Sequence, residues 1–146
     1  MNNSAREEYL AQEVFTATPQ KLQLMLLEAA LRFGERTKKH WELGQPEKAL
    51  ESIQRCQSIV SELLGGLAPS RGTELYQRLS GIYLFSYRSL VEAARTQDEN
   101  QLNDVLRVLQ IERETWREVC EKLGTPNSTK PPHFDMSRQS SFSLEG

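Results

Sequence analysis

The sequence is poor in cysteine and histidine, with two of each among its 146 residues. Cys56 and Cys120 stand too far apart for a CxxC site, and two cysteines do not make a disulfide framework. Both fall inside helices that we predict below, so we expect reduced, unreactive thiols. These scarcities disfavour a disulfide-rich secreted protein.

The chain also lacks long apolar runs and an excess of positive charge. No run approaches the ~20 residues that a membrane-spanning helix needs. The opening residues 1–4 lack the basic-then-apolar pattern of a signal peptide. A net charge of −2 gives no long-range positive field for nucleic acid or anionic lipid. We therefore expect a cytoplasmic protein that binds no nucleic acid and does not insert into a membrane.

Glycine and proline are few and lie in clusters, which divides the chain into helices. Thr18-Pro19 is an N-cap followed by proline at the first helical position. Asp98 can cap the last helix, and Gly124 with Pro126 ends it. No alternating β-branched run is present. The predicted helices span 19–43, 46–64, about 71 or 73 to 97, and 98–123.

Four long helices with short connections predict an all-α fold, an antiparallel up-down four-helix bundle. Residues 1–18 are predicted to form a short helix and cap segment, and residues 19–123 the bundle domain. Residues 124–146 hold five serines and three prolines without any apolar period. We expect this last segment to be a disordered tail.

Two of the predicted helices carry more apolar surface than one core face requires. On a helical wheel, residues 19–43 have a main stripe, which we expect to face the core: Leu22, Met25, Leu26, Ala29 and Phe33. Leu24, Leu27 and Leu31 form a second stripe nearly opposite, which we expect to face outward. In the third helix Tyr76, Tyr83 and Tyr87 form a ladder beside the core line.

The surplus apolar surface has two interpretations, which can coexist. One is a wide core covered by the apolar N-terminal segment. The other is a groove for an amphipathic helix or an extended peptide of a partner. The candidate partner-binding residues are Tyr9, Val14, Leu24, Leu27, Leu31, Tyr76, Tyr83 and Tyr87.

The residue patterns of common catalytic sites are missing. There is no glycine-rich phosphate loop, and no histidine or carboxylate spacing typical of a zinc or di-iron site. We expect no catalytic residue, no metal and no cofactor, hence no enzyme. Two alternatives stay open, a structural helical adaptor and a histidine phosphotransfer bundle that would use His40. Against the latter, Leu43 stands where a cation would hold the phosphoryl group.

Several motifs together resemble the family of the flagellar secretion chaperone FliS, over residues 3–123. The opening Tyr9-Leu-Ala-Gln-Glu-Val14, the cap Thr16-Ala17-Thr18-Pro19 and the leucine-rich helix after it are the most specific pieces. The segment Leu79-Ser-Gly-Ile82-Tyr83-Leu84-Phe85 and Trp116 are similar to later parts of that family. Leu27 and Leu84 depart from it, since the family usually carries Tyr and Asp there.

The resemblance implies a chaperone that binds the C-terminal segment of flagellin, which is disordered when free. It would prevent premature polymerisation and present flagellin to the export gate of the flagellar type III apparatus. It also implies that the N-terminal segment with Tyr9 and Val14 covers part of the groove in the free protein. No ATP, metal or covalent chemistry is implied.

Overall fold

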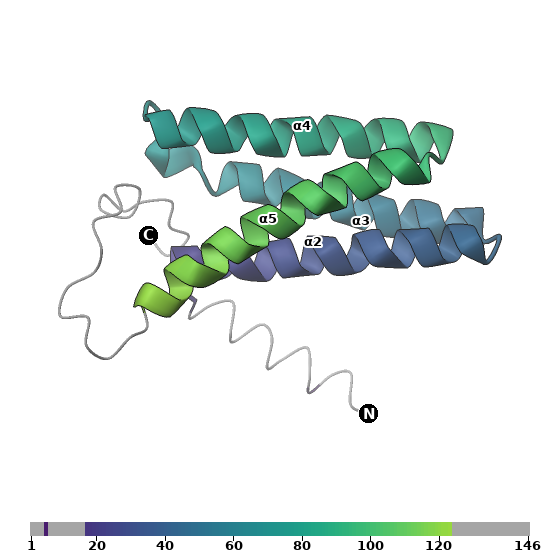
Figure 1. The fold of residues 1–146 in the computed structure, drawn as a ribbon, viewed down its shortest axis with the longest axis horizontal. Coiled ribbons are helices and arrows are strands. Elements are labelled where there is room, and N and C mark those ends of the chain that lie inside the picture. The colour runs from purple at the N-terminus through teal and green to yellow at the C-terminus, as the bar shows by residue number, and fades with distance from the viewer. Residues whose placement is uncertain (1–4, 6–16, 124–146) are drawn as a thin grey trace.

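The computed structural model describes residue 5 and residues 17–123, in which helices follow one another with short connections. Figure 1 shows their arrangement. A single 3-10 turn, Ala68–Ser70, connects the second helix to the third. The α-helices are α2 (Pro19–Glu42), α3 (Pro46–Gly65), α4 (Glu74–Thr96) and α5 (Glu99–Leu123). Their bounds lie within three residues of those predicted from the sequence.

Side-chain caps mark the start of α2, α4 and α5. The Thr18 hydroxyl accepts a hydrogen bond from the backbone N–H of Lys21 at 3.1 Å, as the sequence predicts. Thr73 caps α4 by accepting from the N–H of Tyr76 at 3.0 Å. At α5 the Asp98 carboxylate accepts from two backbone N–H groups, at 3.0 and 3.2 Å. These caps satisfy amide groups that have no partner inside the helix.

The helices form the predicted antiparallel up-down bundle. Each helix packs on the next along the chain, and α5 returns to pack on α2. In Figure 1, the axes of α2, α3 and α4 are roughly aligned, whereas the axis of α5 crosses them obliquely. It starts beside the C-terminal end of α4 and ends towards the N-terminal part of α2, where Cys120 lies near Lys21 and Glu28. The second half of α5 therefore diverges from the first half of α4.

The core face of α2 is the reverse of our prediction. Leu27 is completely buried, and Leu24 and Leu31 belong to the same central cluster. In the stripe predicted as core, Leu22 is buried outside that cluster. The rest of that stripe is only half-buried, namely Met25, Leu26, Ala29 and Phe33. The outward-facing assignment of Leu24, Leu27 and Leu31 was therefore wrong.

Small residues on α2 explain why the second stripe, Leu24, Leu27 and Leu31, faces the core. Ala30, Gly34 and Thr37 recur on the same side of α2, and all three are buried. A Cβ atom at Gly34 would lie 2.3 Å from Cδ2 of Leu106, so α2 and α5 approach closely there. The Thr37 hydroxyl is satisfied within the helix by the carbonyl of Phe33 at 2.8 Å. Close backbone approach, rather than the number of large apolar residues, selects this face for the core.

The tyrosine ladder of α4 is divided by the packing. Tyr83 is fully buried in the core with Leu79, which corrects the prediction that it lies beside the core line. Tyr76 and Tyr87 are half-buried and pack against the edge of the core. By helical spacing Tyr76, Tyr83 and Tyr87 lie on one flank of α4. The packing therefore takes Tyr83 into the core and leaves Tyr76 and Tyr87 at its edge.

Candidate functional site

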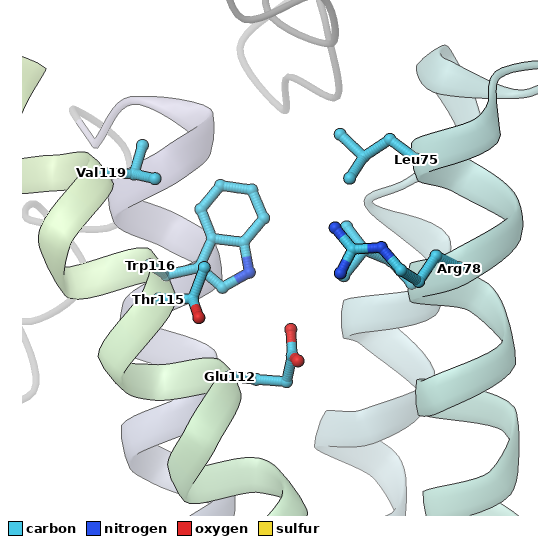
Figure 2. A pocket seen from close by; sticks show the side chains of 7 residues that line it. Leu75, Arg78, Glu112, Thr115, Trp116 and Val119 are labelled. Carbon is cyan, nitrogen blue, oxygen red and sulfur yellow. The ribbon is translucent and has the colours of Figure 1, made fainter.

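A cleft opens where α5 diverges from α4, and we call it the α4–α5 cleft. It encloses a cavity of about 170 Å³. Figure 2 shows side chains from the two helices facing each other across it. The lining residues are Leu75, Arg78 and Leu79 of α4, and Glu112, Thr115, Trp116 and Val119 of α5. Its walls are mainly apolar, with one carboxylate, one guanidinium and one hydroxyl among them.

Aromatic side chains form the inner wall of the α4–α5 cleft. The Trp116 ring projects from α5 towards α4 and is 3% exposed (Figure 2). Tyr83 lies deeper, close enough to Trp116 and Glu112 for both to influence the pKa of its hydroxyl. Burial raises that pKa, Glu112 raises it further, and hydrogen bonding from Trp116 opposes the rise. The inner wall is thus buried and largely apolar, with the Tyr83 hydroxyl and the Trp116 indole N–H as its polar groups.

Glu112 is the titratable group of the cleft. It is buried, and burial raises the pKa of its carboxyl group, while the positive charge of Arg78 on α4 lowers it in part. Arg78 projects into the same space from the opposite wall (Figure 2). A carboxylate opposite a guanidinium gives the cleft a polar pair within apolar walls, and such pairs fix the orientation of a bound chain.

We predict that Glu112→Gln stabilises the bundle at neutral pH. The pKa of Glu112 is higher in the folded state than its ordinary value of 4.5. Protonation of Glu112 therefore favours folding below pH 4.5, and this stabilisation is lost as pH rises through the folded pKa. Glutamine needs no deprotonation, so its advantage should be present at pH 8 and shrink towards pH 4. Thermal melts of both proteins across this range measure the difference. A constant difference would show that burial of the charge is not its cause.

Exposed apolar side chains continue the cleft along the same helix faces. Ile82 and Phe85 follow Leu75 and Arg78 at helical spacing on α4, and Ile111 precedes Thr115 by one turn on α5. Phe85 is 52% exposed and Ile111 60% exposed. Helical spacing places these side chains on flanks of α4 and α5 that continue from the residues lining the cavity, and we call them the apolar strip. Such a strip is the kind of surface that binds an amphipathic or extended partner segment.

The structure brings few of the predicted site residues to this cleft. Tyr83 lies beneath it, and Leu24, Leu27 and Leu31 lie in the core. Tyr76 and Tyr87 pack at the edge of the core and do not line the cleft. Tyr9 and Val14 lie outside the described residues. Sequence reasoning missed Trp116, Glu112, Phe85 and Ile111 as candidates. The available signal was the surplus apolar surface of α4, which includes Phe85, together with the isolated Ile111 on the outer flank of α5.

The described residues hold little other reactive chemistry. They contain no group of three or more histidine, cysteine or acidic residues able to hold a metal ion. Burial raises the pKa of Cys56 to about 12, and its thiol donates to the carbonyl of Ala30 at 3.3 Å. His40 is half-buried, with Nδ1 2.8 Å from Oε1 of Gln45 at the end of α2. These groups have structural roles, which leaves the α4–α5 cleft as the candidate site.

None of the helices in residues 17–123 is both long and apolar enough to cross a membrane. The charged residues distributed along each helix account for this.

Comparison with known proteins identifies the family of this chain. The family model described as "Flagellar protein FliS" matches residues 1–123. The flagellar secretion chaperone FliS of Campylobacter jejuni is 33% identical over 118 residues, which cover 81% of this chain and 92% of the relative. FliS of Bacillus subtilis is 29% identical over 113 residues, covering 77% of this chain and 84% of the relative. The chain belongs to the FliS family of flagellar secretion chaperones.

Proposed function

We propose that this protein binds the C-terminal segment of flagellin in the cytoplasm, through the α4–α5 cleft and its apolar strip. Binding keeps flagellin from polymerising early and presents it to the flagellar type III export gate. The observation that carries the proposal is the cleft with exposed Phe85 and Ile111 beside it, in a member of this chaperone family.

The form of the cleft suits a client that is unfolded when free. Apolar burial contributes about 25 cal/mol per Å², while ordering a disordered segment costs about 2–5 kcal/mol or more. A long client that covers the cavity and the strip can offset this cost without forming a fold of its own. It therefore stays extended enough for export.

The Glu112–Arg78 pair adds orientation to this apolar contact. The backbone of an extended peptide presents N–H donors and carbonyl acceptors, and a carboxylate and a guanidinium can satisfy both. Placed on opposite walls, the two groups favour one direction of the chain over the other. Apolar walls alone would not discriminate between these directions.

The two tryptophans provide a test without any mutation. Trp116 lines the cleft, whereas Trp41 lies near Pro46 and Ala94 at the other end of the bundle. Adding a synthetic peptide of the flagellin C-terminal segment should shift the indole N–H signal of Trp116 in NMR spectra and leave that of Trp41 in place. Calorimetry on the same samples gives the affinity.

Two outcomes separate the parts of the proposal. No binding heat with the peptide would contradict flagellin as the client. Binding heat with an unmoved Trp116 signal would keep the client and reject the cleft as its site. A scrambled peptide of the same composition serves as the control for nonspecific apolar contact.

A further inference from the structure

A second surface lies at the seam between α2 and α3, and its centre is the Phe33 ring. The guanidinium carbon of Arg36 lies 5.0 Å from the centroid of this ring, and that of Arg55 lies 4.9 Å from it. Arg36 comes from α2 and Arg55 from α3, so the two helices place two cations on one aromatic side chain. We call Phe33, Arg36 and Arg55 the arginine–phenylalanine cluster.

Arg36 and Arg55 have no carboxylate partner among the described residues, unlike three arginines of α4 and α5. Arg95, Arg107 and Arg117 each pair with an acidic residue one helical turn away. Within residues 17–123, no carboxylate lies within ion-pair distance of Arg36 or Arg55, and both are exposed. Both charges are held near the same ring, within about a Debye length of each other at 0.1 M salt. Two like charges so placed repel each other until an anion neutralises them.

Stacking on an aromatic ring also prepares these groups for a ligand. A guanidinium held over a ring uses its face, while the N–H groups along its edge stay available for carboxylate oxygens. Met25 and Ala29 precede Phe33 by two turns and one turn on the same face of α2, and both are half-buried. The surface therefore offers apolar contact beside two cationic groups whose orientation is already restricted.

We propose that the arginine–phenylalanine cluster docks an acidic segment of a second protein partner. The segment would place neighbouring carboxylates on Arg36 and Arg55 and an apolar side chain against Met25 and Ala29. In the order of helix packing, the α2–α3 seam lies opposite the α4–α5 seam. The acidic partner and a client in the α4–α5 cleft can therefore be bound at the same time, and the docking does not depend on the identity of the client.

Peptide binding to charge-reversed variants of the full chain tests the proposal. The probe is a synthetic peptide in which glutamates flank a central pair of leucines, with a glutamine version as its partner. We expect the glutamate peptide to bind, to shift NMR signals around Phe33, and to weaken as salt increases. The double variant Arg36→Glu/Arg55→Glu should weaken binding by roughly tenfold or more, because attraction becomes repulsion.

The matched control is Arg88→Glu on α4, an exposed arginine that also has no carboxylate partner among the described residues. It should bind the peptide as the unmodified protein does, and circular dichroism should show that all variants stay folded. Equal binding of the glutamate and glutamine peptides would overturn the proposal. So would equal weakening in the control, signal shifts confined to another surface, or no binding at millimolar peptide.

Discussion

Leu27→Glu is expected to unfold the bundle, the largest effect on stability that we predict for a single substitution. Leu27 is completely buried in the central cluster. Loss of a buried leucine side chain costs about 2–5 kcal/mol in packing. The new carboxylate has no partner there, and an unpaired buried charge adds a further large cost. The sum is comparable with the whole stability of a typical domain, about 5–15 kcal/mol.

The matched control is the same substitution at Leu43, which follows α2 and is 59% exposed. Leu43→Glu should shift the unfolding midpoint in urea only slightly, because surface substitutions usually change stability by less than about 0.5 kcal/mol. Circular dichroism and urea titration compare the two variants. A cooperative, near-normal transition for Leu27→Glu would mean that the leucine stripe of α2 does not support the core.

The double variant Phe85→Glu/Ile111→Glu should remove client binding and leave the fold intact. Both residues are more than half exposed, so the new charges stay in water in the free protein. Covering them with an apolar client would desolvate two carboxylates and forfeit about 3 kcal/mol of apolar contact. A loss of this size weakens binding about a hundredfold.

Leu43→Glu/Leu50→Glu is the control for this pair. Leu50 is 47% exposed and lies with Trp41 at the other end of the bundle from the cavity. The double variant Leu43→Glu/Leu50→Glu introduces the same charges away from the proposed site, so calorimetry with the flagellin peptide should give an unchanged affinity. Normal affinity for Phe85→Glu/Ile111→Glu would move the client away from the α4–α5 seam.

The helices could be predicted from the sequence because their ends carry strong local signals. Thr18-Pro19 and Asp98 mark helix starts through side chains that act within one turn. The orientation of α2 could not be predicted in this way. A wheel with two apolar stripes does not show which one meets the other helices, and the decisive contact, Gly34 against Leu106, joins residues far apart in the sequence.

The same limit applies to the site. The tyrosine ladder and the leucine stripe suggested a groove, but the α4–α5 cleft depends on the oblique course of α5. That course results from contacts between helices and has no local sequence signal. The departures from the family pattern now have different meanings. Leu27 lies in the core, whereas Leu84 is 38% exposed on the surface of α4.

The close contact between Gly34 and Leu106 acts as a pivot for the outer half of α5. Leu106 lies ten residues before Trp116, which is about 15 Å along a helix. A small rotation of α5 about this contact would therefore displace Trp116 more than Leu106, because displacement grows with distance from the axis of rotation. Gly34 and Leu106 are buried and do not line the cavity, yet their contact sets the position from which α5 extends along the cleft. The width of the opening is thus adjustable from inside the bundle, and selection for a longer or bulkier client can act on Gly34 as well as on the cleft itself.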